Sequence, residues 1–367
     1  MSSLQPAVRI FQIHYSAETR ALLDESFIPL DNASNERPDW REYWPIRNYF
    51  LQNPPVAGDY YGFLSPAFRA KARLSSRTVL AFVNANLGHA DVMLFSPFYD
   101  HIAFFLNQGE QGALVHQSCA SAFEQSLALI APRFRMAETV GCSRNTGYCN
   151  YFVATGAFWS EWLARCELIF DCAERGDTPL GRALNANVDY NSQAAPLKVF
   201  IIERAVSALL ATQPRWRVRA YNSMLLPFSR SPLGAMAAEL AALDALKIAY
   251  LTEGHEEYKQ AFFKLRAQAR RAAAPVVGIA MPEPTLDPDG ATGGFSEPWR
   301  CTGPARSTKP GPPIGRSWQG NPSPTAGLAR PVGLRVHAAP MRNALCQGQS
   351  GTRVGCARTL CVRSAAG

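Results

Sequence analysis

The chain has 367 residues and a formal net charge of +8, and both composition and charge change sharply along it. Residues 275–367 hold 13 of the 27 prolines, 14 of the 26 glycines and only three aromatic residues. They also carry +6 of the net charge, which leaves +2 for residues 1–274. A domain this close to neutral, with dispersed basic residues, argues against a nucleic-acid partner.

We therefore expect residues 1–274 to form one α/β domain and residues 275–367 to be a low-complexity, disordered tail. The abrupt change is also what a shifted reading frame in GC-rich DNA produces, so we interpret the tail as a frameshift product. Translating the coding DNA past codon 274 in the other two frames tests this interpretation. A continuation with helix or strand periodicity would support it.

The cysteines and the N-terminus indicate a compartment. Five of the nine cysteines belong to the domain, and none forms a C-x-x-C pair. This pattern favours free thiols in a reducing compartment over disulfides or a zinc ribbon. No charged start with a long apolar run and no stretch of eighteen apolar residues occurs. We expect a cytoplasmic protein without a transmembrane segment, for which a peripheral association with membrane machinery stays open.

Runs of β-branched and aromatic residues predict the strands of the domain. The central one belongs to NTGYCNYFVATGAFWSEW, which is typical of a strand, a turn and a helix. A final segment alternates polar and apolar residues like an edge strand. In chain order the strand-bearing segments are residues 8–15, 60–68 (a strand or a turn), 91–97, 145–162 and 216–221.

Apolar residues at helical spacing predict seven further segments. Pro45 lies within the first of them, either disturbing its middle or marking its first turn. Ser75 and Ser76 are suited to cap the second. The predicted helices cover residues 40–52, 76–86, 101–107, 117–130, 196–211, 233–251 and 256–271.

Polar residues follow two of the predicted strands. Tyr15 lies at the C-terminal end of the first, Asp31 and Asn32 come after it, and Asp100 and His101 come after the strand at residues 91–97. Ligands of open α/β sheets gather where parallel strands end, so we expect these side chains to share one crevice.

Glu203 and Arg204 interrupt the otherwise apolar helix predicted for residues 196–211. Burying an unpaired charge is costly, so each side chain must have a partner or face a cavity. Two interpretations stay open: Glu203 is a functional acid, or the two residues form a bridge that fixes helix packing.

Several catalytic signatures are missing. The sequence contains neither G-x-G-x-x-G nor G-x-x-x-x-G-K-[ST], and neither G-x-S-x-G nor H-E-x-x-H. A dinucleotide enzyme, a P-loop ATPase, an α/β-hydrolase and a zincin are therefore disfavoured. The only D-x-D begins at Asp287, within the tail, and we interpret it as a chance occurrence.

The domain resembles a family of bacterial glycosyltransferase-like proteins linked to capsule or lipopolysaccharide synthesis. The resemblance covers nearly all of residues 8–270. It implies a GT-A-like, Rossmann-like α/β fold with a mostly parallel central sheet flanked by helices. It also implies transfer of a sugar from a nucleotide-sugar donor to a hydroxyl of a glycan or lipid-linked acceptor. The segments that carry it are LDN (30–32), EYWPIR (42–47), YYGFLSP (60–66), DVMLFSPF (91–98), NYFVA followed by FW (150–159) and IIER (201–204).

On the donor side, the resemblance suggests that Tyr15, Asp31 and Asn32 hold the nucleotide. Arg47 would lie near its phosphates, because a guanidinium matches phosphate oxygens in fork geometry. Asp91 would lie by the donor at the edge of the sheet.

On the acceptor side, Asn150, Tyr151 and Trp159 would shape the site. Glu203 would be the general base that takes the acceptor proton. The aromatic residues have a simpler alternative, which is that they are ordinary core side chains.

The resemblance has one departure: the D-x-D that holds a metal in that fold is absent from residues 1–274. Dependence on Mn²⁺ or Mg²⁺ therefore stays open. The departure also favours the alternative function, a non-catalytic nucleotide- or carbohydrate-binding protein of the same fold. A third interpretation is a helical scaffold that binds no nucleotide.

Overall fold

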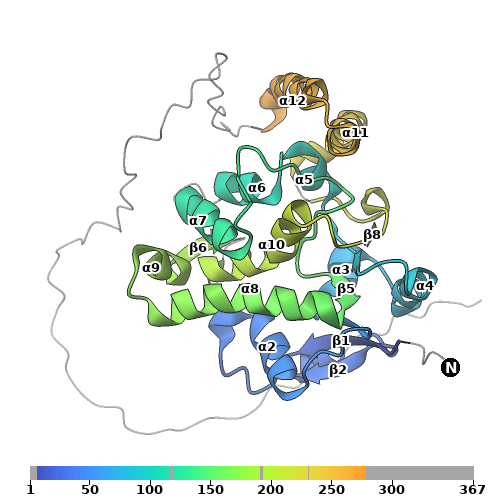
Figure 1. Cartoon of the computed structure of the whole chain (residues 1–367), viewed down its shortest axis with the longest axis vertical. Helices are drawn as coiled ribbons and strands as arrows, with labels where there is room; N and C mark the ends of the chain where they lie inside the picture. The colour runs from blue at the N-terminus through green and yellow to red at the C-terminus, as the bar shows by residue number, and fades with distance from the viewer. Residues whose placement is uncertain (1–5, 116–118, 191–192, 230, 278–367) are drawn as a thin grey trace, which may run out of the picture. The chain divides into compact units, whose positions relative to one another are not determined.

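The computed structural model describes residues 6–115, 119–190, 193–229 and 231–277. Within them the chain folds as an α/β structure with a mixed six-stranded central sheet and twelve α-helices (Figure 1). The last helix ends at Val277, three residues beyond the expected end of the domain. The expectation of a disordered tail concerns residues that, from 278 onward, lie outside the described part of the chain.

The strand order of the central sheet is β2-β1-β3-β5-β4-β8. β5 runs antiparallel to its neighbours β3 and β4, while the remaining pairs are parallel. Five strands therefore end at the same edge, where β5 begins. The strands are β1 (Val8–His14), β2 (Ile28–Asp31), β3 (Tyr60–Leu64), β4 (Val92–Leu94), β5 (Phe152–Thr155) and β8 (Val218–Ala220).

Helices cover both faces of this sheet, and a hairpin of β6 (Asn187–Tyr190) and β7 (Gln193–Pro196) forms a second, two-stranded sheet. The helices are α1 (Ala17–Arg20), α2 (Tyr43–Gln52), α3 (Phe68–Ala72), α4 (Ser76–Asn86), α5 (Tyr99–Phe104), α6 (Gln108–Val115), α7 (Ala120–Ile130), α8 (Gly156–Arg175), α9 (Pro179–Asn185), α10 (Leu197–Thr212), α11 (Ala237–Glu253) and α12 (Glu256–Val277).

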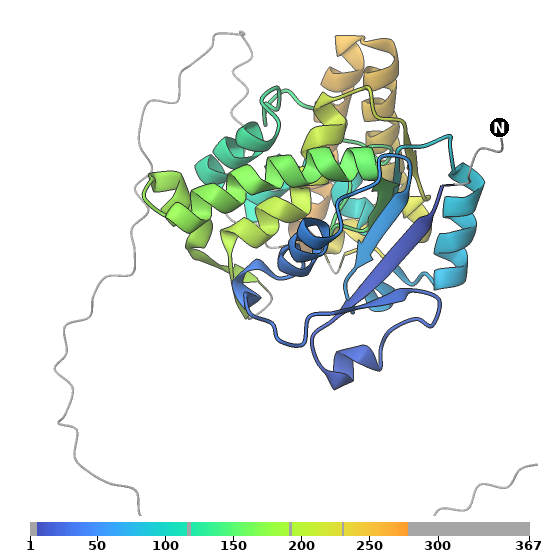
Figure 2. The ribbon, with the colours of Figure 1, turned by 60° about the horizontal axis from the view of Figure 1, so that its bottom comes forward.

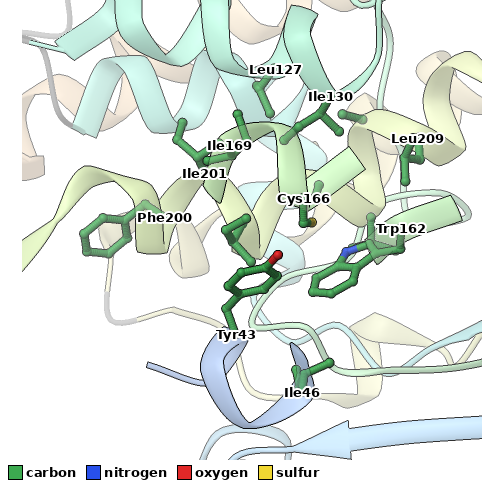
Figure 3. Close-up of a cluster of buried hydrophobic side chains, with 14 of the residues drawn as sticks. Tyr43, Ile46, Leu127, Ile130, Trp162, Cys166, Ile169, Phe200, Ile201 and Leu209 are labelled. Atoms are coloured by element: carbon green, nitrogen blue, oxygen red, sulfur yellow. The ribbon is translucent and has the colours of Figure 1, made fainter. Parts of the chain in front are cut away.

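Side chains alternate between the two faces along each central strand, so the sheet separates two cores. In β5, Phe152 and Ala154 pack with α2, α8 and α10, whereas Val153 packs with α3 and α4. The larger core, between the sheet and the helices α2, α7, α8 and α10, is rich in aromatic rings (Figure 3). Figure 2 shows α4 on one side of the sheet and α8 on the other.

The central prediction, a strand, a turn and a helix within residues 145–162, is confirmed by β5 and α8. Thr155 caps the helix by accepting a hydrogen bond from the Phe158 amide, and Gly156 lies so close to Val56 that a Cβ atom would meet its carbonyl oxygen at 2.1 Å. This junction therefore requires glycine.

Two prolines lie where they disturb no backbone hydrogen bond. No strand is predicted from the sequence at residues 28–31, but β2 forms there as an edge strand, where the missing amide hydrogen of Pro29 breaks no ladder. Pro45 occupies the third position of α2, where the amide has no partner within the helix. Of the two alternatives for Pro45, the first turn is therefore the observed one.

Candidate functional site

The candidate site lies at the carboxyl edge, defined here as the edge where β1, β2, β3, β4 and β8 end and β5 begins. The strand ends bring together segments that are far apart in sequence. The amide of Asn32 donates to the His14 carbonyl oxygen at 2.9 Å, and the amide of Phe95 donates to the Tyr151 carbonyl oxygen at 2.8 Å. Polar side chains next to β1, β2 and β5 therefore lie along the carboxyl edge.

Glu203, on α10, interacts electrostatically with charged groups from two other elements. The pKa of Glu203 is raised, mainly because burial penalises the carboxylate, and the negative charge of Glu42 raises it further. Nearby positive charges lower this pKa, and Lys71 has the largest effect among them. The Glu203 side chain is partly exposed, and within the described residues it forms no hydrogen bond or ion pair. A partly exposed carboxylate with a raised pKa is suited to accept a proton.

Arg204 does not bridge to Glu203. Its guanidinium donates to the carbonyl oxygens of Gln108 and Phe200 and to Oε1 of Gln111. The bridge that the sequence left open is therefore not formed, and Arg204 instead ties α10 to α6. Glu203 keeps its carboxylate available.

Three buried polar atoms at or next to the carboxyl edge have no hydrogen-bond partner among the described residues: Tyr15 Oη, His14 Nδ1 and Asn150 Oδ1. The nearest acid to His14 is Asp31, whose Oδ1 lies 3.8 Å from Nδ1 and is largely exposed. Glu42 lies close enough to Tyr15 to help burial raise the pKa of its hydroxyl group. Buried polar groups are nearly always paired, so this concentration indicates a place where a ligand completes the pairing.

The backbone at this edge is strained. Cys149 and Asn150 have consecutive positive φ angles of 61° and 55°, and Phe98 has a φ angle of 69°. Arg41, which precedes Glu42, has a φ angle of 48° with ψ at −131°. Residues other than glycine adopt such angles at a cost, and these conformations cluster at functional sites.

Cys149 is not suited to act as a nucleophile. Burial raises the pKa of its thiol to about 12, and Glu203 contributes to the increase. Lys71 Nζ lies 3.8 Å from its sulfur atom, but this contact does not offset the burial. Since the thiolate is the reactive form, covalent cysteine catalysis is disfavoured. All five described cysteines are free, as the sequence predicted.

Of the predicted site residues, Tyr15, Asp31, Asn32, Asn150 and Tyr151 follow a strand end or precede β5 at the carboxyl edge. Tyr151 is 1% exposed, and its hydroxyl group is 2.7 Å from the hydroxyl group of Ser65. Tyr151 is therefore a core side chain that packs beneath the surface at the carboxyl edge. Asn150 retains a side-chain oxygen without a hydrogen-bond partner among the described residues.

Asp91 was expected beside the donor, but it precedes β4 and lies at the opposite edge of the sheet. Both of its carboxylate oxygens accept hydrogen bonds from the Arg217 side chain, and Oδ2 also accepts from the Arg217 amide. These hydrogen bonds lower the pKa of Asp91. Asp91 therefore lies away from the candidate site, because it precedes its strand whereas the candidate site lies where the parallel strands end.

Replacing Asp91 with asparagine is expected to lower the free energy of unfolding by about 1 kcal/mol at pH 7, since Arg217 is largely exposed. The folded-state pKa of Asp91 is lowered, so its contribution is present above the unfolded pKa near 4 and disappears as the pH falls further. Urea unfolding at pH 7 and at pH 3 checks both points. The exposed Asp177→Asn serves as the control, and an Asp91→Asn effect that persists unchanged at pH 3 would contradict the assignment.

Arg47 and Trp159 also have structural roles. Arg47 Nε donates to Glu167 at 2.7 Å, and its guanidinium lies 4.3 Å from the centre of the Phe170 ring, so its partners come from α8. Trp159 is 0% exposed, and its Nε1 donates to the Tyr61 carbonyl oxygen at 2.8 Å. Neither side chain is placed to contact a ligand at the carboxyl edge, and for Trp159 the alternative of a core aromatic is the observed one.

The sequence did not single out Glu42, Lys71 or Arg41 as site residues. All three act electrostatically on Glu203. Glu42 precedes α2 and Lys71 lies in α3, so their proximity to α10 depends on tertiary packing. The one signal available was EYWPIR, which belongs to the resemblance and begins at Glu42.

Asp100, which follows β4, has a structural role. It is completely buried and accepts hydrogen bonds from the Ser229 amide and from the hydroxyl groups of Ser229 and Ser231. His101 Nε2 is 4.0 Å from Asp100 Oδ2, and burial lowers the pKa of His101. Asp100 thus holds the loop that leads to α11.

Among the residues that the structure describes, no three His, Cys, Asp or Glu side chains gather as a metal ion would require. No helix in the described part of the chain is long and apolar enough to cross a membrane. Comparisons with models of protein families, with curated proteins and with solved structures found no match to this chain.

Proposed function

We propose that this protein transfers a sugar from a nucleotide-sugar donor to a hydroxyl group of a glycan or lipid-linked acceptor, as in bacterial surface polysaccharide synthesis. The carboxyl edge would bind the donor, and the fold would be of the GT-A-like type. The observation that carries the proposal is the unpaired carboxylate of Glu203, with Glu42, Lys71 and Arg41 around it. An acid beside cations suits an anionic donor and a hydroxyl nucleophile.

In the proposed reaction the acceptor oxygen attacks the anomeric carbon of the donor sugar. The bond between that carbon and the phosphate oxygen breaks, and its electron pair leaves with the nucleoside diphosphate. Glu203 takes the proton from the acceptor hydroxyl group. Lys71 and Arg41 offset the negative charge that develops on the departing phosphate, and Tyr15 and Asn150 offer a hydroxyl group and a carbonyl oxygen to the donor.

The described residues do not fit a resident Mn²⁺ or Mg²⁺. A hard cation of this kind needs several oxygen ligands from protein, substrate or water, and the described carboxylates do not cluster in threes. Glu42 and Glu203 interact electrostatically, but the cation Lys71 acts on Glu203 as well. The cationic side chains, rather than a metal, are the groups present to meet a diphosphate.

Donor binding is the first test of this proposal. A nucleotide-sugar at a hundred times its dissociation constant is expected to stabilise the protein by about 2.7 kcal/mol. A thermal-shift panel of uridine, thymidine and guanosine diphosphate sugars measures this effect. Replacing Lys71 with methionine is expected to abolish most of the shift, because it removes one of the cations near Glu203 that would bind the diphosphate of the donor.

Lys259→Met is the matched control, since Lys259 lies on α12 and pairs with Glu256. It should leave the shift unchanged. Absence of any shift across the panel would contradict the proposal and favour a protein that binds no nucleotide. Release of nucleoside diphosphate is measured with and without Mn²⁺. Donor binding without this release would favour the second candidate function, a non-catalytic binding protein. The lack of a metal-binding acidic cluster among the described residues supports that candidate.

A further inference from the structure

A hollow lies at the other end of the carboxyl edge, where β8 ends. Its volume is about 130 Å³, and its lining includes Tyr99, Arg144, Tyr221, Asn222, Ser223 and Asp244. The Tyr221 amide donates to the Leu94 carbonyl oxygen, which places the hollow beside the ends of both β4 and β8. None of the residues around Glu203 lines it, so it is a separate site on the same border.

The hollow contains an unexplained polar group. Ser223 is 3% exposed, and its Oγ has no hydrogen-bond partner among the described residues. The neighbouring Asn222 uses its side chain to accept from the Met224 amide, so it does not complete the pairing. A buried hydroxyl group that lines a cavity and lacks a partner is suited to bind a polar atom of a ligand.

The remaining lining groups define the chemistry of that ligand. Asp244 is 4% exposed and accepts from the Ser143 amide at 2.9 Å, which leaves acceptor capacity towards the hollow. Its negative charge is balanced by Lys247, which is buried next to it and donates to two carbonyl oxygens of the α5 region. Tyr221 is partly buried and adds aromatic surface, whereas Tyr99 is only 2% exposed and Arg144 adds a cationic group. A ligand with several hydroxyl groups and an apolar face matches this combination.

Size restricts the ligand further. An apolar cavity of about 150 Å³ holds one benzene ring, so a hollow of about 130 Å³ that opens to solvent on one side suits a single six-membered ring. We propose that this hollow binds one pyranose ring through Ser223, Asp244 and Tyr221. Its use as the acceptor subsite rests on the proposed function, whereas binding of the ring itself does not.

The test measures binding of methyl α- and β-glycosides of D-glucose, D-galactose and D-mannose to the full chain by saturation-transfer NMR, without any nucleotide. We expect saturation transfer to the ring protons of at least one of them. Replacing Ser223 with alanine should weaken that glycoside about fivefold, the loss expected for one hydrogen bond. The variant should unfold at the same temperature or higher, because the hydroxyl group has no partner to lose.

Ser126→Ala is the matched control, because Ser126 Oγ is equally buried and unpaired but lies in α7 and does not line the hollow. It should leave glycoside binding unchanged. The proposal is overturned if no glycoside binds, or if Ser126→Ala and Ser223→Ala weaken binding equally. Glycoside binding without donor binding would support the hollow as a binding site and contradict the transferase. Sugar transfer that is unchanged by Ser223→Ala would support the transferase and contradict the use of the hollow as its acceptor subsite.

Discussion

Replacing Glu203 with glutamine is expected to lower the rate of sugar transfer by about 10²- to 10⁴-fold, the range for loss of a general base. Glutamine has nearly the same shape but cannot take the acceptor proton. Donor binding should change little, because Lys71 and Arg41 remain in place. The measurement is release of nucleoside diphosphate from the donor that gives the largest thermal shift, together with the dissociation constant of that donor.

The pH profile separates a base from a structural carboxylate. The pKa of Glu203 is raised by burial, so the wild-type rate should fall as the pH decreases through that raised value. The residual activity of Glu203→Gln should lack this acidic limb. Glu167→Gln is the control, because Glu167 pairs with Arg47 between α2 and α8. A variant at Glu203 with unchanged turnover, or an acidic limb that survives the substitution, would remove Glu203 from the reaction.

Replacing Trp159 with alanine is expected to lower the free energy of unfolding by about 3–5 kcal/mol, as for other fully buried aromatic residues. The ring stacks on Phe152 with centroids 4.5 Å apart and contacts the rings of Phe63 and Phe50. The substitution also leaves the Tyr61 carbonyl oxygen without its indole donor. Chemical denaturation followed by circular dichroism measures the loss.

Trp44→Ala provides the comparison, because Trp44 is only partly buried and lies beside the guanidinium groups of Arg37 and Arg47. We expect it to cost clearly less stability than Trp159→Ala. If Trp159→Ala were as stable as the wild type but lost binding of acceptor sugars, the original assignment of Trp159 to the acceptor side would be restored.

The sequence predicted the parts of the fold in which one short segment carries its own signal. The first strand, the junction at Thr155 and the apolar helix α10 are all recognisable from local periodicity or capping. Most residues at the carboxyl edge could be predicted because ligands of parallel sheets bind where the strands end. Asp91 lies at the opposite edge because it precedes its strand.

The charged surroundings of Glu203 were not predictable in this way. Glu42 and Lys71 come from the start of α2 and from α3, and only the packing of both helices around the sheet brings them near α10. The strained conformation of Cys149 and Asn150 likewise depends on how β5 enters the sheet, because neither residue is a glycine that would mark the turn. Long-range packing is the information that a single sequence does not display.

The insertion of β5 between β3 and β4 has a consequence for biosynthesis. β3 and β4 are complete by Leu94, but the strand that joins them ends at Thr155 and is thus translated some sixty residues later. A nascent chain therefore carries the three-stranded part β2-β1-β3 and the unpaired strand β4, both with exposed hydrogen-bonding edges, until β5 leaves the ribosome. Ribosomal pausing or premature termination before that point should leave a product that chaperones and proteases recognise. The protein therefore escapes degradation only once β5 has completed the carboxyl edge.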